Sequence, residues 1–187
     1  QRNVLLLDDN LLAYPEVEGL LDEMIARRYA INFSQTLDIA YLNEAKFNLL
    51  RQIDSMNAKF NKRMIYFSLN YARHIRHFKR RADMLKGFGV DNVCVVCIYG
   101  FDTRLSQDYQ RWMMLRRLRL VPFFQEYWPI PGIPARVPAN FFDMDLHEVI
   151  RLTFRSNGQN WEKYLRWLSH LYFHTYGKYY LPLLRVI

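Results

Sequence analysis

Short apolar runs recur along the first two thirds of the chain, and polar or glycine residues follow each run. A segment with the apolar spacing of a helix separates each run from the next. This alternation is typical of successive βα units on a parallel sheet. Because each interval is long enough for a right-handed crossover, we expect the strands to be parallel neighbours. The runs lie at 4–7, 31–33, 64–67, 93–98 and 120–124.

The intervals between the runs carry helix signals of their own. Apolar side chains from Val17 to Ile25 recur at helical spacing, shortly after Pro15, a residue favoured in the first turn of a helix. Asn43 is a good N-cap residue for the next helix. The same reasoning predicts further helices at 71–86, 104–119, 145–154 and 160–176.

The number of units limits the architecture. A complete eight-stranded βα barrel takes about 250 residues, whereas this chain has 187. We therefore predict an α/β fold in the form of a parallel-stranded, TIM-like partial barrel of about five βα units, or an open parallel sheet. Residues 1–128 form this core, and 129–187 form a proline-rich loop and C-terminal helices that pack on it. Since a buried-type strand begins almost at Gln1, we expect the N-terminal part of a larger domain to precede it.

Composition narrows the possible partners and the compartment. The formal net charge of +8 suits an anionic substrate, a nucleic acid or an acidic partner. Two cysteines do not make a disulfide framework, which favours the reducing cytosol. No apolar run approaches about 18 residues, so we expect no membrane span.

Polar residues follow each predicted strand, where parallel α/β folds place their chemistry. Carboxylates there can hold an ammonium group or a metal, and a glycine lets a ligand approach the backbone. The alternative is an ordinary turn or helix cap, because Asp, Asn, Ser and Gly favour such positions. The candidates are Asp8, Asp9 and Asn10, then Gln35 and Asp38, then Ser68 and Asn70, then Tyr99, Gly100, Phe101 and Asp102, and finally Glu126 and Tyr127.

Two motifs that suggest metal binding have simpler interpretations. Cys94 and Cys97 form a C-x-x-C sequence, but residues three apart on a strand point to opposite faces, so we expect core cysteines. His170 and His174 have the spacing of a helical metal pair, but no glutamate lies between them as in H-E-x-x-H. We expect these histidines to pack in the structure or lie on the surface.

A basic run on the predicted helix at 71–86 could contact the phosphates of a nucleic acid. Because its charges alternate with an apolar stripe, a solvated helix face is the alternative interpretation. The residues are Arg73, Arg76, Lys79, Arg80 and Arg81.

Five segments together resemble a known family. The segment 3–12, with Asp8, Asp9 and Asn10 after its apolar run, resembles the second-strand motif of radical S-adenosylmethionine (SAM) enzymes. Segments 31–39, 63–70 and 93–102 are similar to the next three strands of that family, and 122–127 is similar to the last. The resemblance covers residues 3–128.

The resemblance implies a partial barrel of six βα units and an oxidoreductase activity. In this family a three-cysteine loop after the first strand binds a [4Fe-4S] cluster that reduces SAM. The resulting 5′-deoxyadenosyl radical abstracts hydrogen from the substrate. Because the C-x-x-x-C-x-x-C loop is absent here, the resemblance implies that it lies upstream of Gln1. This chain alone would then bind no cluster and be inactive.

The resemblance also assigns roles to the strand ends. It implies that Asp8, Asp9 and Asn10 lie near the amino group of SAM, and that Ser68 and Asn70 lie near its ribose or methionine. The segment 98–101, with Tyr99, Gly100 and Phe101, would lie near the adenine. The other assigned residues are Gln35 and Asp38, also toward SAM, and Glu126 and Tyr127, toward an unknown substrate.

Two other function classes remain open at the level of sequence. The chain could be a basic α/β module that binds RNA or DNA without catalysis, using the basic run. It could also be a barrel enzyme that holds a divalent metal with Asp9, Asp38 and Glu126.

Overall fold

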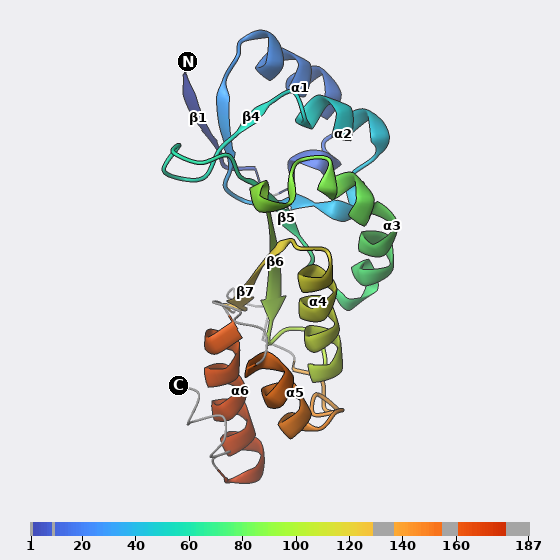
Figure 1. Ribbon diagram of the computed structural model, residues 1–187, viewed down its shortest axis with the longest axis vertical. Coiled ribbons are helices and arrows are strands. Elements are labelled where there is room, and N and C mark those ends of the chain that lie inside the picture. The colour runs from blue at the N-terminus through green and yellow to red at the C-terminus, as the bar shows by residue number, and fades with distance from the viewer. Residues whose placement is uncertain (1, 9, 129–136, 155–160, 179–187) are drawn as a thin grey trace. The chain divides into compact units, whose positions relative to one another are not determined.

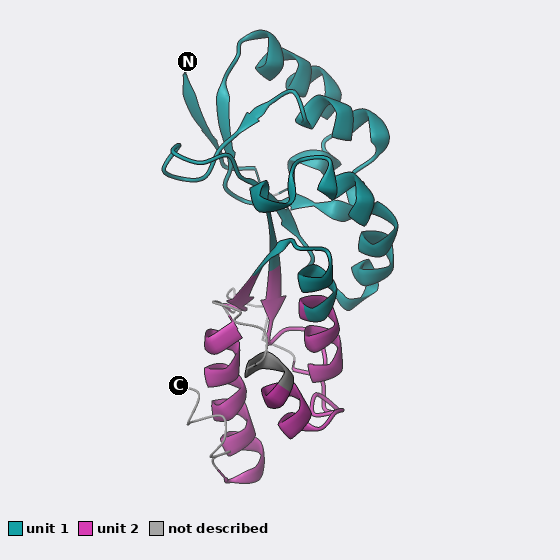
Figure 2. Cartoon of the chain, in the orientation of Figure 1, with its two compact units in different colours: residues 1–96, 113–122 teal, residues 97–112, 123–187 magenta. Residues whose placement is uncertain are grey.

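The computed structural model describes residues 2–8, 10–128, 137–154 and 161–178 (Figure 1). Its contacts divide the chain into two compact units (Figure 2). Unit 1 comprises residues 1–96 and 113–122, and unit 2 comprises residues 97–112 and 123–187. This division differs from the expected boundary near residue 128, because the chain passes from one unit to the other more than once.

A three-stranded parallel sheet begins unit 1, in the order β1–β2–β4. Residues of β2 are buried throughout, which explains the uninterrupted apolar character of this strand apart from Asn32. Helices α1 and α2 lie side by side next to this sheet (Figure 1). The elements are β1 (Asn3–Leu6), α1 (Val17–Ala26), β2 (Ala30–Phe33), α2 (Glu44–Leu50) and β4 (Asp54–Ser55).

A second sheet has the strand order β3–β5–β6–β7. The pairs β3–β5 and β5–β6 are parallel. Helix α3 (Ile75–Lys86) follows β5, and the predicted stripe of Ile75, Phe78, Ala82 and Leu85 is buried. The strands are β3 (Leu37–Asp38), β5 (Ile65–Ser68), β6 (Val93–Tyr99) and β7 (Val121–Glu126).

The prediction of an α/β fold with parallel strands is confirmed, but the prediction that the five runs pair as successive neighbours in one array is wrong. The run at 31–33 pairs with β4 and not with the run at 64–67, which pairs with β3. The chain turns after β2 at Thr36, whose φ is 64°. A loop closed by an antiparallel bridge between Met56 and Arg63 separates β4 from β5. Two-residue strands are too short to show a periodicity in sequence.

Four short 3-10 helices lie between these elements in the described part of the chain. They are η1 (Leu11–Ala13), η2 (Ile39–Tyr41), η3 (Ala72–His74) and η4 (Val90–Asn92). The first helix begins at Val17, so Pro15 lies in the preceding turn. Asn43 caps α2 as predicted, since its side chain accepts a hydrogen bond from the Lys46 N–H.

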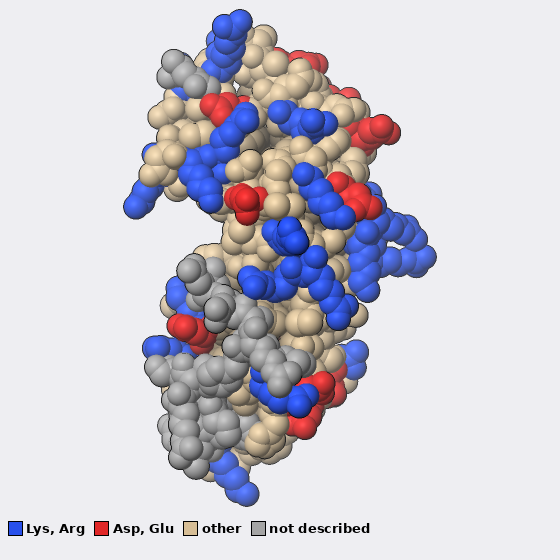
Figure 3. Space-filling view, in the orientation of Figure 1, with Lys and Arg blue, Asp and Glu red and all other residues tan. Residues whose placement is uncertain are grey.

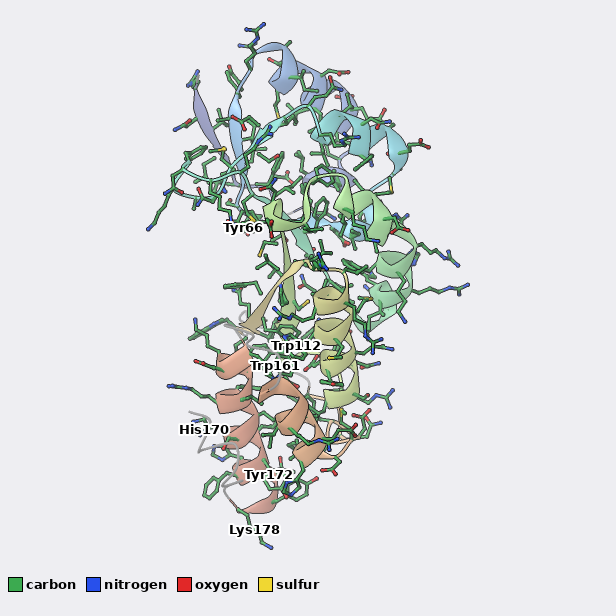
Figure 4. The ribbon with its side chains drawn as sticks, in the orientation of Figure 1. Tyr66, Trp112, Trp161, His170, Tyr172 and Lys178 are labelled. Atoms are coloured by element: carbon green, nitrogen blue, oxygen red, sulfur yellow. The ribbon has the colours of Figure 1, made fainter. Side chains whose placement is uncertain are left out.

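Aromatic side chains form the core of unit 2. The rings of Trp112 and Trp161 stack with centroids 5.0 Å apart, and Figure 4 shows them together. Phe124 of β7 meets Trp161 edge-on, also at 5.0 Å. This contact joins β7 to the C-terminal helix that begins at Trp161. The helices are α4 (Leu105–Arg117), which runs from unit 2 into unit 1, α5 (Leu146–Phe154) and α6 (Trp161–Tyr176).

Two further expectations concern the tail and the membrane. Most of the predicted proline-rich loop lies outside the described residues. Within the described residues, every helix is too short or too polar to cross a bilayer.

Candidate functional site

Polar side chains gather at the carboxyl ends of the unit 1 strands. We call Asp8, Asn10, Asp38 and Ser68 the strand-end cluster. Asp8 follows β1, and its Oδ1 accepts a hydrogen bond of 2.8 Å from the Asn10 N–H. Asp38 and Ser68 are paired residues at the ends of the parallel strands β3 and β5. Each member therefore ends a strand or lies just beyond one, as the sequence predicts.

Hydrogen bonds from side chains to backbone carbonyls fix the segments around these strand ends. The Ser34 hydroxyl, beyond β2, donates a 2.5 Å hydrogen bond to the Leu6 carbonyl at the end of β1. Helix η1, which begins directly after Asn10, contacts β3. The Lys46 ammonium group donates to the Leu12 carbonyl of η1 at 2.8 Å. The loop that carries Asp8 and Asn10 is thus fixed next to the strand that carries Asp38.

The side-chain oxygen of Asn10 is buried, which is unusual in a loop. This Oδ1 accepts no hydrogen bond from any described residue. A buried acceptor without a donor is costly, by about 1–3 kcal/mol. A ligand that brings an N–H or O–H group to this oxygen would remove that cost.

Asp38 has both a local and a tertiary partner. Its Oδ1 accepts a 2.9 Å hydrogen bond from the Ala40 N–H and lies 3.7 Å from Nδ1 of His74. Nε2 of His74 accepts a hydrogen bond from Nε of Arg73. The local bond is the capping role that the sequence offered as the alternative to ligand binding, and Asp38 also retains a half-buried position beside Ser68.

The remaining described candidates of unit 1 follow β2 and β5. Gln35 is exposed beyond β2, and Asn70 is half-buried two residues beyond the end of β5. Asp9 lies outside the described residues, so its assignments to SAM and to a divalent metal stay predictions.

The candidates at the end of β6 lie in unit 2 and are built into its aromatic core. Gly100 has a φ of 79°, and a Cβ there would lie 3.0 Å from Cζ2 of Trp167. Its missing side chain therefore makes room for Trp167, which is a structural reason for glycine that the sequence did not reveal. Tyr99 is buried under the same indole, with ring centroids 5.0 Å apart. Phe101 and Tyr127 lie ring against ring at 4.7 Å.

A cavity of about 630 Å³ lies within unit 2, and we call it the β7–α6 cavity. Aromatic side chains from the ends of β6 and β7 and from α6 make up half of its lining. Trp128, just beyond β7, is 76% exposed. The aromatic lining residues are Tyr99, Phe123, Phe124, Trp128 and Trp167.

The other half of the lining is polar and includes two cations, one carboxylate and a histidine. Lys163, Arg166 and His170 come from α6, and Glu126 and Gln125 come from β7. Burial raises the pKa of Tyr99, and the Glu126 carboxylate raises it further. The sequence predicted Glu126 as a ligand-binding residue but missed the three basic residues. Their spacing on one face of the tail helix was the available signal.

A buried ion pair, also unexpected from sequence, supports the end of β6. Arg111 and Asp108 are fully buried on α4, with the Arg111 guanidinium bonded to the Asp108 carboxylate. Arg111 also donates to the Ile98 carbonyl at 2.8 Å, and the Thr103 hydroxyl donates to Asp108. Burial raises the pKa of Asp108, while the Arg111 charge and the Thr103 hydroxyl oppose that rise. The pair fixes the backbone directly before Tyr99.

The cysteines and histidines provide no metal centre in the part of the chain that the structure describes. No group of three or more His, Cys, Asp or Glu side chains that could hold a metal occurs among those residues. Cys94 and Cys97 are free and buried in β6, as predicted for core cysteines. Burial raises the pKa of the Cys94 thiol to about 11, so the thiol is protonated at neutral pH. His170 and His174 are exposed on α6.

The basic run gathers Lys and Arg side chains along α3, visible in Figure 3. Arg76, Lys79 and Arg80 are exposed. Two members of the run have structural partners. Nε of Arg81 donates a 2.6 Å hydrogen bond to the Leu42 carbonyl, and the Arg73 guanidinium lies 4.5 Å from the centre of the Tyr71 ring. A contact with phosphates would therefore rest on the first three residues.

Comparisons of this chain with protein families, with characterised proteins and with solved structures found no match.

Proposed function

We propose that the strand-end cluster of unit 1 binds SAM, and that this chain is the SAM-binding part of a radical SAM enzyme. The observation that carries the proposal is the buried Asn10 Oδ1, on a residue whose backbone N–H donates to the Asp8 carboxylate beyond the carboxyl end of β1. The ammonium group of SAM supplies three N–H donors and a positive charge. Both match an amide oxygen that lacks a donor and a neighbouring carboxylate.

The paired strand ends of β3 and β5 support the same proposal. Asp38 and Ser68 lie side by side in register, and a carboxylate with a hydroxyl suits a ribose diol. Asp38 and Ser68 would position the ribose while Asp8 and Asn10 hold the amino group. In this proposal these residues bind and orient SAM. The bond that is cleaved, between carbon and the sulfonium sulfur, belongs to SAM itself.

The cysteines of this chain do not fit a [4Fe-4S] cluster. The family uses three thiolates on one loop, whereas Cys94 and Cys97 are the two cysteines here and are buried three residues apart on one strand. The cluster ligands of the proposed enzyme must therefore come from other residues than these. We assign no step of reductive cleavage to this chain.

Calorimetric titration of the 187-residue chain with SAM and with adenosine tests the proposal. We expect SAM to bind more tightly than adenosine, which lacks the ammonium group. Substitution Asp8→Asn should weaken SAM binding by about tenfold, which corresponds to about 1.4 kcal/mol. Asn10→Ala should have a similar effect and leave adenosine binding unchanged.

The matched control is Asp91→Asn, because Asp91 is an exposed carboxylate in η4, before the amino end of β6. Circular dichroism should show that all three variants remain folded. Absence of SAM binding, or equal losses in Asp8→Asn and Asp91→Asn, would contradict the proposal.

A second candidate function is nucleic-acid binding through α3. The exposed cations Arg76, Lys79 and Arg80 favour it, together with the net charge of +8. The chain should then bind a labelled single-stranded RNA with an affinity that falls steeply between about 50 and 200 mM salt.

Charge reversal of Arg76, Lys79 and Arg80 to Glu should weaken this binding strongly and reduce the salt dependence of what remains. Reversal of Lys59, Lys62 and Arg117 changes the net charge equally at exposed positions off α3 and serves as the control. Equal losses in the two triple variants would show that total charge, and not α3, causes the binding.

A further inference from the structure

The basic residues of the β7–α6 cavity share one face of α6. Lys163, Arg166, Trp167 and His170 have the spacing i, i+3, i+4 and i+7, which places them in one stripe along the helix. The core stripe of the same helix is a different one, formed by Trp161, Tyr164, Leu165 and Leu168. Lys163 and Arg166, the charged members of the cavity stripe, are exposed and are therefore not required for packing the helix. Figure 4 labels His170 on this helix.

The positive charges of this stripe are not neutralised within the described structure. Neither Lys163 nor Arg166 forms an ion pair with any described carboxylate. One carboxylate, that of Glu126, lines the cavity. Cations around a concave, partly apolar site attract anions more strongly than the same cations on a flat surface.

The aromatic half of the cavity combines a fixed ring with an exposed one. Trp167 is held by Tyr99 at 5.0 Å and by an edge-on contact with Phe141 at 5.4 Å. Trp128 is 76% exposed. Both indoles line the cavity, and an exposed indole is a surface on which a flat ring can stack.

We propose that the β7–α6 cavity binds a planar aromatic anion. The ring of the ligand lies against the indoles of Trp128 and Trp167, and its anionic group pairs with Lys163 and Arg166. The Glu126 carboxylate opposes the anion and accepts a hydrogen bond from a donor on the ring. A volume of about 630 Å³ suits a ligand the size of a mononucleotide or smaller.

Two sources can supply this chemistry, a nucleoside phosphate or an aromatic carboxylate. The probes are therefore AMP and indole-3-acetate, each with a neutral counterpart, adenosine and indole-3-acetamide. Binding of AMP and adenosine to the full chain is measured by tryptophan fluorescence, with excitation at a wavelength that adenine does not absorb. Binding of the two indole probes is measured by calorimetry. We expect at least one anion to bind about tenfold more tightly than its neutral counterpart.

The test becomes specific when cations and the carboxylate of the cavity are removed in separate variants, because the expected effects on anion affinity are opposite. Lys163→Gln and Arg166→Gln should each weaken binding of the anion about fivefold or more, and leave the neutral probe unchanged. Lys178→Gln and Arg151→Gln are matched controls, because these exposed cations of unit 2 do not line the cavity. Glu126→Gln removes the opposing carboxylate, so it should tighten binding of the anion. A gain in affinity cannot result from misfolding.

The outcomes decide both the proposal and the source of the ligand. Preference for AMP assigns a nucleoside phosphate, and preference for indole-3-acetate assigns an aromatic carboxylate. Equal affinity for the anions and their neutral counterparts overturns the proposal, and so do equal losses in the cavity variants and the controls. The proposal does not depend on SAM binding, because the cavity belongs wholly to unit 2. Asp8→Asn should leave these affinities unchanged.

Discussion

At the scale of single residues, the most consequential pair is Asp108 with Arg111. Both side chains are fully buried, and they form an ion pair with each other. Arg111 also donates a hydrogen bond to the Ile98 carbonyl. Removing one member of a buried ion pair leaves the other charge without compensation. The pair therefore stabilises unit 2 only as long as both members are present.

We predict that Asp108→Ala lowers the free energy of unfolding by about 3–5 kcal/mol, measured by urea denaturation with tryptophan fluorescence. Asp83→Ala is the contrasting variant, because its pair with Lys86 is exposed and contributes at most about 1 kcal/mol. Replacing both Asp108 and Arg111 by apolar residues should recover part of the loss. A small effect of Asp108→Ala alone would show that Arg111 finds another partner.

Cys94 gives a prediction about alkaline pH. Burial raises the pKa of its thiol to about 11, so the folded state disfavours the thiolate. The stabilisation from the neutral thiol is fully present below the ordinary cysteine pKa and is lost as the pH rises through the folded value. Cys94→Ala should therefore reduce the fall in unfolding free energy between about pH 9 and pH 11. An unchanged alkaline profile would contradict the assignment to Cys94.

At the scale of elements, short helices depend on their caps. Helix α2 is seven residues long, and the Asn43 side chain accepts a 2.8 Å hydrogen bond from the Lys46 N–H. We predict that Asn43→Ala lowers the unfolding free energy by about 1 kcal/mol in chemical denaturation. Asn48→Ala removes the same side chain from an exposed position within α2 and should be neutral or slightly stabilising. Equal effects would mean that the cap contributes nothing.

The strands show which elements can be predicted and why. The long apolar runs at 64–67 and 93–98 match β5 and β6 closely, because a buried parallel strand needs consecutive apolar residues. The strands β3 and β4 were missed, since two residues such as Leu37 and Asp38 carry no period. The helices were predicted to within a few residues, because their buried stripes recur over several turns.

At the scale of the whole molecule, the four tryptophans report on one unit. Trp112, Trp128, Trp161 and Trp167 all belong to unit 2. However, β6, α4 and β7 each contain residues of both units. Unfolding of unit 1 should therefore also disrupt the parts of these three elements that belong to unit 2. We expect the two units to unfold together.

Leu12→Ala tests this expectation, because Leu12 is fully buried in unit 1. It should destabilise the protein by about 2–5 kcal/mol. Tryptophan fluorescence and circular dichroism should show the same shift in denaturation midpoint. A shift in circular dichroism without a shift in fluorescence would show that the units unfold independently.

The sequence by itself determined the α/β class, the parallel strands and the polar residues at their ends. These features depend on local periodicity and on residue type, which are visible without coordinates. The tertiary structure decided the division into sheets, the packing and the cavity, because these features depend on contacts between residues far apart in the chain. It separated the strands into two sheets, filled the space at Gly100 with Trp167, and joined Glu126 of β7 to Lys163 and Arg166 of α6 around one cavity.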